Sequence, residues 1–224
     1  MTLAPHAPQS LQAMDQGHHS LSLTAESLAV ERGGRLVVAG LDFALAPGDA
    51  LTLRGANGTG KTSILRAVAG FSEPAEGSIR FAANGEDMDP AEARALNLHW
   101  LGGDDALADK LTVAESLSFW RALLGGTQND GLLSRLGLSG KENTALGRLS
   151  TGQRRRAGMG RLLCAQRPLW LLDEPMIGLD DQGRELLLDI VAEHRARGGI
   201  VLMASHDQGV PDVPVLRLRA QEAA

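Results

Sequence analysis

The sequence GANGTGKT, at residues 55–62, is the segment that most clearly indicates the fold. An apolar segment, Leu51 to Arg54, precedes it, and Lys61 to Ala69 carries apolar residues at helical spacing behind it. Glycines at this spacing, between a strand and a helix, let backbone amides approach phosphate oxygens; Lys61 then reaches the β and γ phosphates and Thr62 can hold Mg²⁺. A chance glycine turn is disfavoured by that context. The stretch therefore predicts a phosphate-binding loop.

Two further apolar segments end in the polar residues that a nucleotide site needs. Leu169 to Leu172 is followed by Asp173 and Glu174, and Ile200 to Ser205 is followed by His206. Because ligands bind beyond the carboxyl ends of parallel strands, we expect these side chains beside the phosphate loop. We predict that Asp173 holds Mg²⁺ through water, that Glu174 is the general base for the attacking water, and that His206 contacts the γ-phosphate.

A second anion-binding helix terminus is predicted at LSTGQ, residues 149–153. Ser150 and Gln153 have the spacing of a capping box, so the amides that follow Ser150 are aligned toward an anion. A helix cap without any ligand explains this segment equally well when it is taken alone. Since the chain has one phosphate loop, the segment makes sense against the ATP of a second protein molecule.

Length, charge and composition exclude several classes of protein. The chain has 224 residues, 22 Lys and Arg against 27 Asp and Glu, and a formal net charge of −5. This balance argues against unspecific binding of nucleic acid, which needs a cationic surplus. Cys164 is the only cysteine, which excludes an internal disulfide, and we expect it to be a buried, inert thiol. No apolar run approaches the roughly 18 residues of a membrane span.

The chain divides into segments with different patterns. Residues 1–20 are predicted to be a disordered tail, whose His18 and His19 we expect to be solvated rather than metal ligands. Residues 21–224 are predicted to form one α/β domain. Its N-terminal part, to Phe81, favours antiparallel strands with a hairpin turn at Gly33 and Gly34. An inserted α-helical subdomain is expected at about residues 104–150, and helices alternate with strands of a parallel sheet after it.

These motifs, in this order, resemble the ATP-binding subunit of ABC transporters over about residues 21–210. GANGTGKT matches the Walker A motif, LSTGQ the signature, LWLLDEP the Walker B motif, residues 177–180 the D-loop, and His206 the switch histidine. The resemblance implies a P-loop NTPase core that binds ATP and Mg²⁺ and forms a head-to-tail homodimer, or a pair with a sister subunit. The residues that it assigns to ATP are Gly55, Ala56, Asn57, Gly58, Thr59, Gly60, Lys61, Thr62 and Ser63. Those that it assigns to the ATP of the second copy are Ser150, Thr151, Gly152 and Gln153, with Asp180 in the D-loop.

The compact helical insert, LSTGQRRRAGMGRLL and the early end after His206 narrow the resemblance to the ATPases of cytochrome c maturation, the haem exporters. This implies the membrane subunits CcmB, CcmC and CcmD as partners, with no role for nucleic acid. It implies a peripheral position on the cytoplasmic face of the bacterial inner membrane, where ATP powers haem export or release of a haem-loaded chaperone. Two alternatives stay open: the ATPase of an exporter for a drug, lipid or lipoprotein, and an ATP-dependent structural module with vestigial hydrolysis.

The sequence departs from the family pattern in two places. The glutamine of the Q-loop is absent, and Asp104 stands at about its position, where its carboxylate could meet Mg²⁺ or water. The aromatic residue that stacks on adenine is also absent. Arg32 lies near that place and could stack on the base, but a solvated hairpin arginine is an equal alternative.

Two groups of residues on predicted helices are assigned from general tendencies. We expect the run Arg154 to Arg156 to be solvated, since charge runs normally lie on exposed helix faces. For Phe119 and Trp120 we prefer core packing to a docking groove for a membrane subunit, and we expect Trp170 in the core as well.

Overall fold

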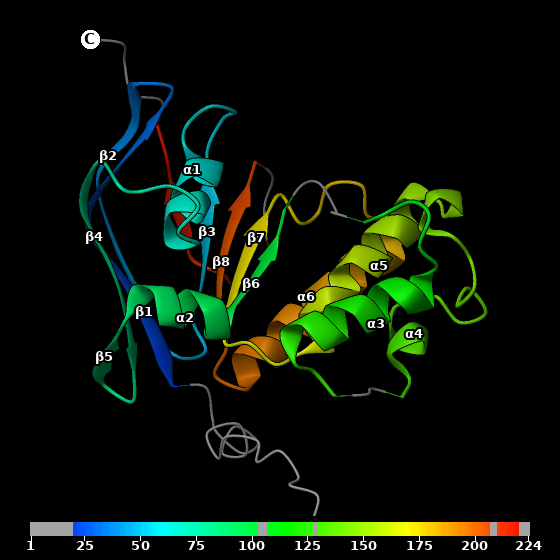
Figure 1. Cartoon of the computed structure of the whole chain (residues 1–224). Coiled ribbons are helices and arrows are strands. Elements are labelled where there is room, and N and C mark those ends of the chain that lie inside the picture. The colour runs from blue at the N-terminus through cyan, green and yellow to red at the C-terminus, as the bar shows by residue number, and fades with distance from the viewer. Residues whose placement is uncertain (1–19, 103–106, 128–129, 207–209, 220–224) are drawn as a thin grey trace, which may run out of the picture.

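The computed structural model describes residues 20–102, 107–127, 130–206 and 210–219. Within them the chain forms two β-sheets with helices between and beside them, which confirms the predicted α/β class (Figure 1). The predicted tail, apart from Ser20, lies outside the described residues, as do His18 and His19.

The first sheet is antiparallel, and its strand order is β2-β1-β4-β5. Its strands are β1 (Leu21–Arg32), β2 (Arg35–Leu45), β4 (Glu76–Ala83) and β5 (Glu86–Met88). The turn between β1 and β2 consists of Gly33 and Gly34, which have φ angles of 61° and 74°. Two successive positive φ angles favour glycine, so the hairpin forms where the sequence predicts it.

The second sheet is parallel, in the order β6-β7-β8-β3-β9. Its strands are β6 (Leu98–Leu101), β7 (Leu169–Asp173), β8 (Ile200–Ser205), β3 (Ala50–Arg54) and β9 (Val215–Arg217). All residues of β7 and β8 are buried, which explains their unbroken apolar sequences. The sequence analysis missed the edge strands β6 and β9 because they are only 4 and 3 residues long.

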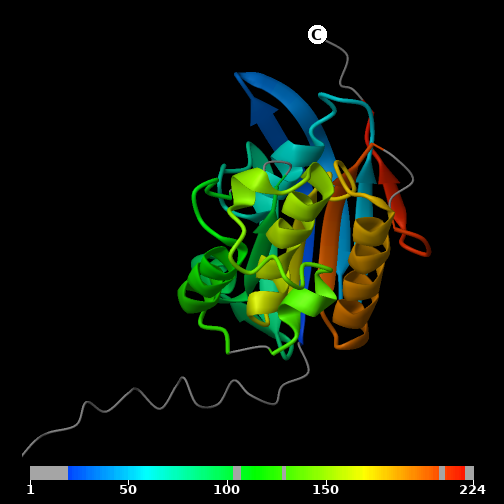
Figure 2. The ribbon, with the colours of Figure 1, turned by 90° about the vertical axis from the view of Figure 1, so that its right-hand side faces the viewer.

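The helices separate into two groups around the parallel sheet. They are α1 (Lys61–Val68), α2 (Pro90–Asn97), α3 (Val113–Leu124), α4 (Leu132–Arg135), α5 (Thr151–Cys164) and α6 (Asp181–Ala196), with a 3₁₀ turn, η2 (Leu146–Arg148). Helix α1 lies between the two sheets and shares their core (Figure 1). Helices α5 and α6 cover the opposite face of the parallel sheet, as the side view shows (Figure 2). None of the helices in the described ranges is long and apolar enough to cross a membrane.

A third core lies where the helical insert was expected. It joins α3, α4 and η2 to the outer side of α5 through buried residues such as Val113, Leu136, Leu146 and Ala157. Cys164 is buried in this cluster, as predicted, and burial raises the pKa of its thiol to about 11, which disfavours the reactive thiolate.

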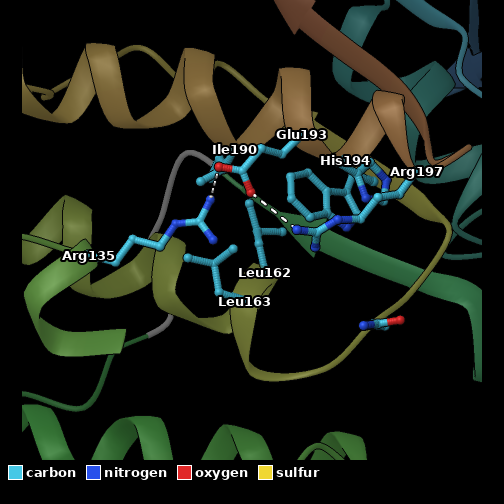
Figure 3. A pocket seen from close by; sticks show the side chains of 9 residues that line it. Arg135, Leu162, Leu163, Ile190, Glu193, His194 and Arg197 are labelled. Atoms are coloured by element: carbon cyan, nitrogen blue, oxygen red, sulfur yellow. Dashed lines mark ion pairs between the residues drawn. The ribbon is translucent and has the colours of Figure 1, made fainter. Parts of the chain in front are cut away.

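An ion pair connects this cluster to α6 on the surface, and its carboxylate also pairs with the end of α6. Arg135 of α4 lies 2.7 Å from Glu193 of α6, and Arg197 lies 3.5 Å from the same carboxylate (Figure 3). Beneath them Trp170 stacks on His194, with ring centroids 3.8 Å apart. Trp170 therefore belongs to the core, as expected.

Two expectations about helix residues are wrong. Arg155 and Arg156 are buried, with 3% and 4% of their surface exposed, because α5 is covered by the parallel sheet on one side and by α3 on the other. Phe119 points outward and is 53% exposed, whereas Trp120 is half-buried against the third core. A helix with cover on both sides does not have the single exposed face that the sequence argument assumed.

Candidate nucleotide-binding site

The N-terminus of α1 is open toward an external anion. Gly60 precedes the helix with a φ of 95°, no side chain caps the helix, and its first turn holds no acidic residue. A Cβ atom on Gly60 would lie 2.4 Å from a methyl group of Val38, so only glycine fits at this position. The free amides and the helix dipole therefore favour a phosphate group here.

Lys61 completes this anion site. Its ammonium group is almost fully buried and donates to the carbonyl oxygens of Gly55 and Ala56, at 2.8 and 3.3 Å. It also lies 3.5 Å from a carboxylate oxygen of Glu174. A buried cation with carbonyl and carboxylate neighbours is held at the loop, where it can exchange a loop carbonyl for a phosphate oxygen.

Thr62 and Asp173 form a pair of oxygen ligands at the same edge of the sheet. The Thr62 hydroxyl donates to Asp173 Oδ1 over 3.1 Å. Burial raises the pKa of the Asp173 carboxyl, and the charge of Glu174 adds to the rise. A hydroxyl and a carboxylate are hard donors that suit Mg²⁺, which keeps several waters and needs few protein ligands. The described residues contain no group of three or more His, Cys, Asp and Glu side chains that could hold a metal.

Glu174 and His206 meet at the ends of β7 and β8. Glu174 Oε2 accepts hydrogen bonds from the His206 amide, at 3.2 Å, and lies 2.8 Å from His206 Nδ1. The backbone of Glu174 has a φ of 49°, a left-handed conformation that is costly for a residue with a side chain. Its amide donates to Ala204 over 2.9 Å. A cavity of about 230 Å³ adjoins Glu174 and His206 and is large enough for water.

The LSTGQ segment forms the capping box that the sequence predicts. The Gln153 amide donates to Ser150 Oγ at 3.2 Å, and the Ser150 amide donates to Gln153 Oε1 at 3.1 Å. None of the hydrogen bonds or ion pairs found among the described residues joins residues 150–153 to residues 55–62 of the same chain. The two predicted anion sites are thus built separately.

The D-loop packs against this segment. Asp180 caps α6 by accepting a hydrogen bond from the Gly183 amide, at 2.9 Å. Its other carboxylate oxygen lies 3.4 Å from Arg156, and a Cβ atom on Gly152 would approach it to 2.6 Å. A side chain at position 152 would therefore displace the Asp180 carboxylate from its present position.

The structure does not test two of the roles that were assigned from the sequence, those of Asp104 and Arg32. Asp104 lies outside the described residues. Arg32 ends β1 at the hairpin and is exposed, which fits both of the alternatives stated for it.

The sequence analysis missed one residue at the site. Arg155 reaches from α5 to the ends of β6 and β7, where its guanidinium donates to the carbonyl oxygens of Gly102, at 3.0 Å, and Glu174, at 3.3 Å. The run of three arginines carries no signal that separates this buried member from an exposed neighbour.

Known proteins are similar to this chain in sequence and in fold. The sequence profile of the ABC transporter family matches residues 38–177. The cytochrome c biogenesis ATP-binding export protein CcmA of Paramagnetospirillum magneticum is 46% identical over 206 residues, which cover 88% of this chain and 94% of the relative. CcmA of Rhodopseudomonas palustris strain HaA2 is 44% identical over 188 residues, or 83% and 92% of the two chains.

Solved structures agree at the level of the fold. An ABC transporter ATP-binding protein from Pyrococcus furiosus superimposes with a TM-score of 0.76 at 22% identity, covering 88% of this chain and 97% of the other. The ATP-binding subunit of another ABC transporter gives a TM-score of 0.75 at the same identity, covering 88% of each chain.

Proposed function

The chain belongs to the ABC transporter family, as an ATPase subunit of the cytochrome c biogenesis type, and from this premise we propose how its residues hydrolyse ATP. The observation that carries the proposal is the position of the Glu174 carboxylate, which lies between Lys61 and His206. A base held between a phosphate-binding lysine and a histidine has the arrangement that attack of water on a terminal phosphate requires.

The phosphate groups of ATP bind at the N-terminus of α1. The amides of residues 55–63 point to the phosphate oxygens, and the Lys61 ammonium contacts the β and γ phosphates. Thr62 and Asp173 would hold Mg²⁺, with Asp173 acting through a water molecule. When bound, this ion neutralises charge that develops on the phosphates.

Glu174 acts on the attacking water. Its carboxylate accepts a proton as the water oxygen bonds to the γ phosphorus, while the bond from that phosphorus to the bridging oxygen breaks and leaves ADP. His206 orients the carboxylate through its amide and ring and contacts the γ-phosphate. The His206 amide, the His206 ring and the Lys61 ammonium surround this one carboxylate and direct it at the reacting water.

A second copy of the chain completes each ATP site. In a head-to-tail homodimer, Ser150, Thr151, Gly152 and Gln153 of one copy contact the γ-phosphate that is bound at α1 of the other. The aligned amides of α5 support this role, since no hydrogen bond found in the described part of the chain links them to its own phosphate loop. Asp180 lies beside this segment and transmits its position to α6.

We propose that the dimer works on membrane subunits of the system, with CcmB, CcmC and CcmD as the partners, at the cytoplasmic face of the bacterial inner membrane. Phe119 and Leu123 of α3, which are 53% and 60% exposed, support a docking surface on that helix. ATP hydrolysis then powers haem export or release of the haem-loaded chaperone. We keep the division into one domain, 21–224, with a helical subdomain at about 104–150, as a prediction.

The test is the formation of c-type cytochromes in cells whose only copy of the protein carries Glu174→Gln, beside a wild-type control. We expect loss of covalent haem, measured by haem staining, with the variant protein present at normal level. Normal staining would contradict a need for hydrolysis and would favour the alternative of a structural module. Purified complex must also lose ATP hydrolysis with Lys61→Ala.

A further inference from the structure

Arg155 connects the helix of the signature segment to the catalytic end of the parallel sheet. It lies in the second turn of α5 and is 3% exposed. Its Nη1 group donates to the carbonyl oxygen of Gly102 at 3.0 Å, and its Nη2 group donates to that of Glu174 at 3.3 Å. Gly102 follows β6 and Glu174 follows β7, two neighbouring strands, so one guanidinium joins both strand ends to α5 (Figure 1).

The burial of this charge calls for an explanation. Removing a guanidinium from water is costly unless hydrogen bonds compensate for it. The planar fork of arginine can serve two carbonyl groups at once, which the single ammonium of lysine does with less fixed geometry. The charge of Arg155 also acts at the site, since it opposes the burial that raises the pKa of Asp173.

The neighbouring arginines do different work. Arg154 forms an exposed ion pair with Asp109 at 2.6 Å, and Arg156 donates to the carbonyl oxygen of Leu136, at 3.0 Å, on the side of α4. Of the three residues in the run, Arg155 is the one whose described hydrogen bonds reach Glu174. A general preference for positive charge on α5 therefore does not account for it.

We infer that Arg155 is a positioning residue, which fixes the main chain of Glu174 relative to α5 and so makes the alignment of the base depend on where the signature helix lies. The inference rests on the proposed function, in which Glu174 activates water. Glu174 holds a left-handed φ of 49°, a conformation that its surroundings must maintain. Ala204 binds its amide and Arg155 binds its carbonyl group, so the residue is held on both sides.

Arg155 therefore links two sites of one chain. One is the N-terminus of α5, which contacts the ATP of a second copy, and the other is Glu174, which acts on the ATP bound at α1. When the N-terminus of α5 contacts the ATP of a second copy, any shift of α5 is passed to the Glu174 carbonyl through one buried side chain. Packed cores transmit such shifts because they hold few discrete arrangements. Hydrolysis at the α1 site of a chain is thus sensitive to whether its own signature is engaged.

The experiment measures steady-state ATP hydrolysis by the complex with Arg155→Gln, Arg155→Lys and a matched control, Arg161→Gln. Arg161 is also a buried arginine of α5, but its guanidinium lies over the Trp120 ring, 5.3 Å from the ring centre and away from the site. We expect Arg155→Gln to lower kcat by at least about tenfold with KM for ATP within about twofold, since a small misplacement of a reacting group is costly. Arg155→Lys restores part of kcat, and Arg161→Gln keeps kcat even where its melting temperature falls.

Other outcomes are decisive as well. Equal kcat for Arg155→Gln and Arg161→Gln would overturn the inference, as would a loss that appears only in KM. If Arg155→Gln does not fold, Arg155→Lys decides alone: reduced kcat at unchanged KM supports the inference, and wild-type kcat overturns it. A different result would contradict the proposed function, namely ATP hydrolysis that survives Glu174→Gln. The two failures are therefore distinguishable.

Discussion

Helices α1 and α5 both present an N-terminus that the sequence assigns to ATP, yet the two ends are built differently. Helix α1 begins after Gly60 with no side-chain cap, whereas α5 begins with the reciprocal capping box of Ser150 and Gln153. Four amides at a helix start need partners. At α1 no side chain supplies a partner, whereas at α5 the Ser150 side chain accepts a hydrogen bond from one of these amides. From this difference we infer that α1 binds ATP in a single copy, and we propose that α5 of a second copy adds to that site.

The largest expected effect separates hydrolysis from binding at the α1 side. Glu174→Gln removes the base but keeps the size of the side chain and one acceptor oxygen, so we expect ATP turnover to fall by about 10²- to 10⁴-fold. ATP binding, measured with a fluorescent nucleotide, should persist. Turnover within a few fold of wild type would show that the base is another residue. It would also contradict the assignment of hydrolysis to the α1 side.

A second pair of variants compares the helix ends directly for ATP binding by single copies. Lys61→Ala removes a charged hydrogen-bond donor to phosphate, so we expect binding to weaken about ten- to hundredfold in an equilibrium titration. Ser150→Ala should leave the affinity of single copies within about twofold. Equal losses in both variants would mean that the ends are not specialised in this way.

A third prediction concerns stability and assembly at α5. Ser150→Ala should cost about 1 kcal/mol of unfolding free energy, as the loss of a helix cap does. Thr112→Ala is the matched control, since Thr112 and Glu115 form the same capping box on α3. Both variants should lower the denaturant midpoint by similar amounts, but only Ser150→Ala should weaken ATP-driven dimer formation. Equal dimer formation in the two would limit Ser150 to a structural cap.

The smallest expected effect is a pH dependence of thermal stability, which we expect at Asp173, beside α1, but not at the capping box of α5. Burial raises the pKa of Asp173, so its charge destabilises the nucleotide-free fold at neutral pH. We expect Asp173→Asn to raise the melting temperature by a few degrees at pH 7. Because the carboxyl group is charged only above its raised pKa, this difference should fade as the pH falls through that pKa toward the ordinary value of about 3.9. Ser150→Ala should show no such pH dependence, since neither capping side chain titrates.

Protonation of Asp173 in that pH range should also weaken Mg²⁺-dependent ATP binding by the wild type. A melting difference between Asp173→Asn and wild type that grows on acidification would contradict the assigned direction of the pKa shift. Thermal unfolding between pH 4 and pH 8, without nucleotide, measures it.

The sequence predicts the α/β fold and the position of the phosphate loop. Glycines such as Gly60 mark that loop, because they adopt a backbone conformation that few other residues adopt. It also predicts that Asp173, Glu174 and His206 gather at one edge, since β7 and β8 are buried apolar runs in a parallel sheet. It does not predict β6 or β9, whose few residues lack a clear pattern. Nor does it predict the burial of Arg155, because the cover over α5 comes from distant parts of the chain.

We propose that α1 binds ATP alone and that α5 of a second copy closes over it. The most direct test is the mass of the Glu174→Gln protein by light scattering, with and without ATP and Mg²⁺. Thr151→Asp in this background adds a carboxylate at an exposed first-turn position, which suits the helix dipole but repels phosphate. The account predicts that ATP doubles the mass of Glu174→Gln, whereas the double variant binds ATP and stays monomeric. A dimer of the double variant, or a monomer of Glu174→Gln saturated with ATP, would contradict it.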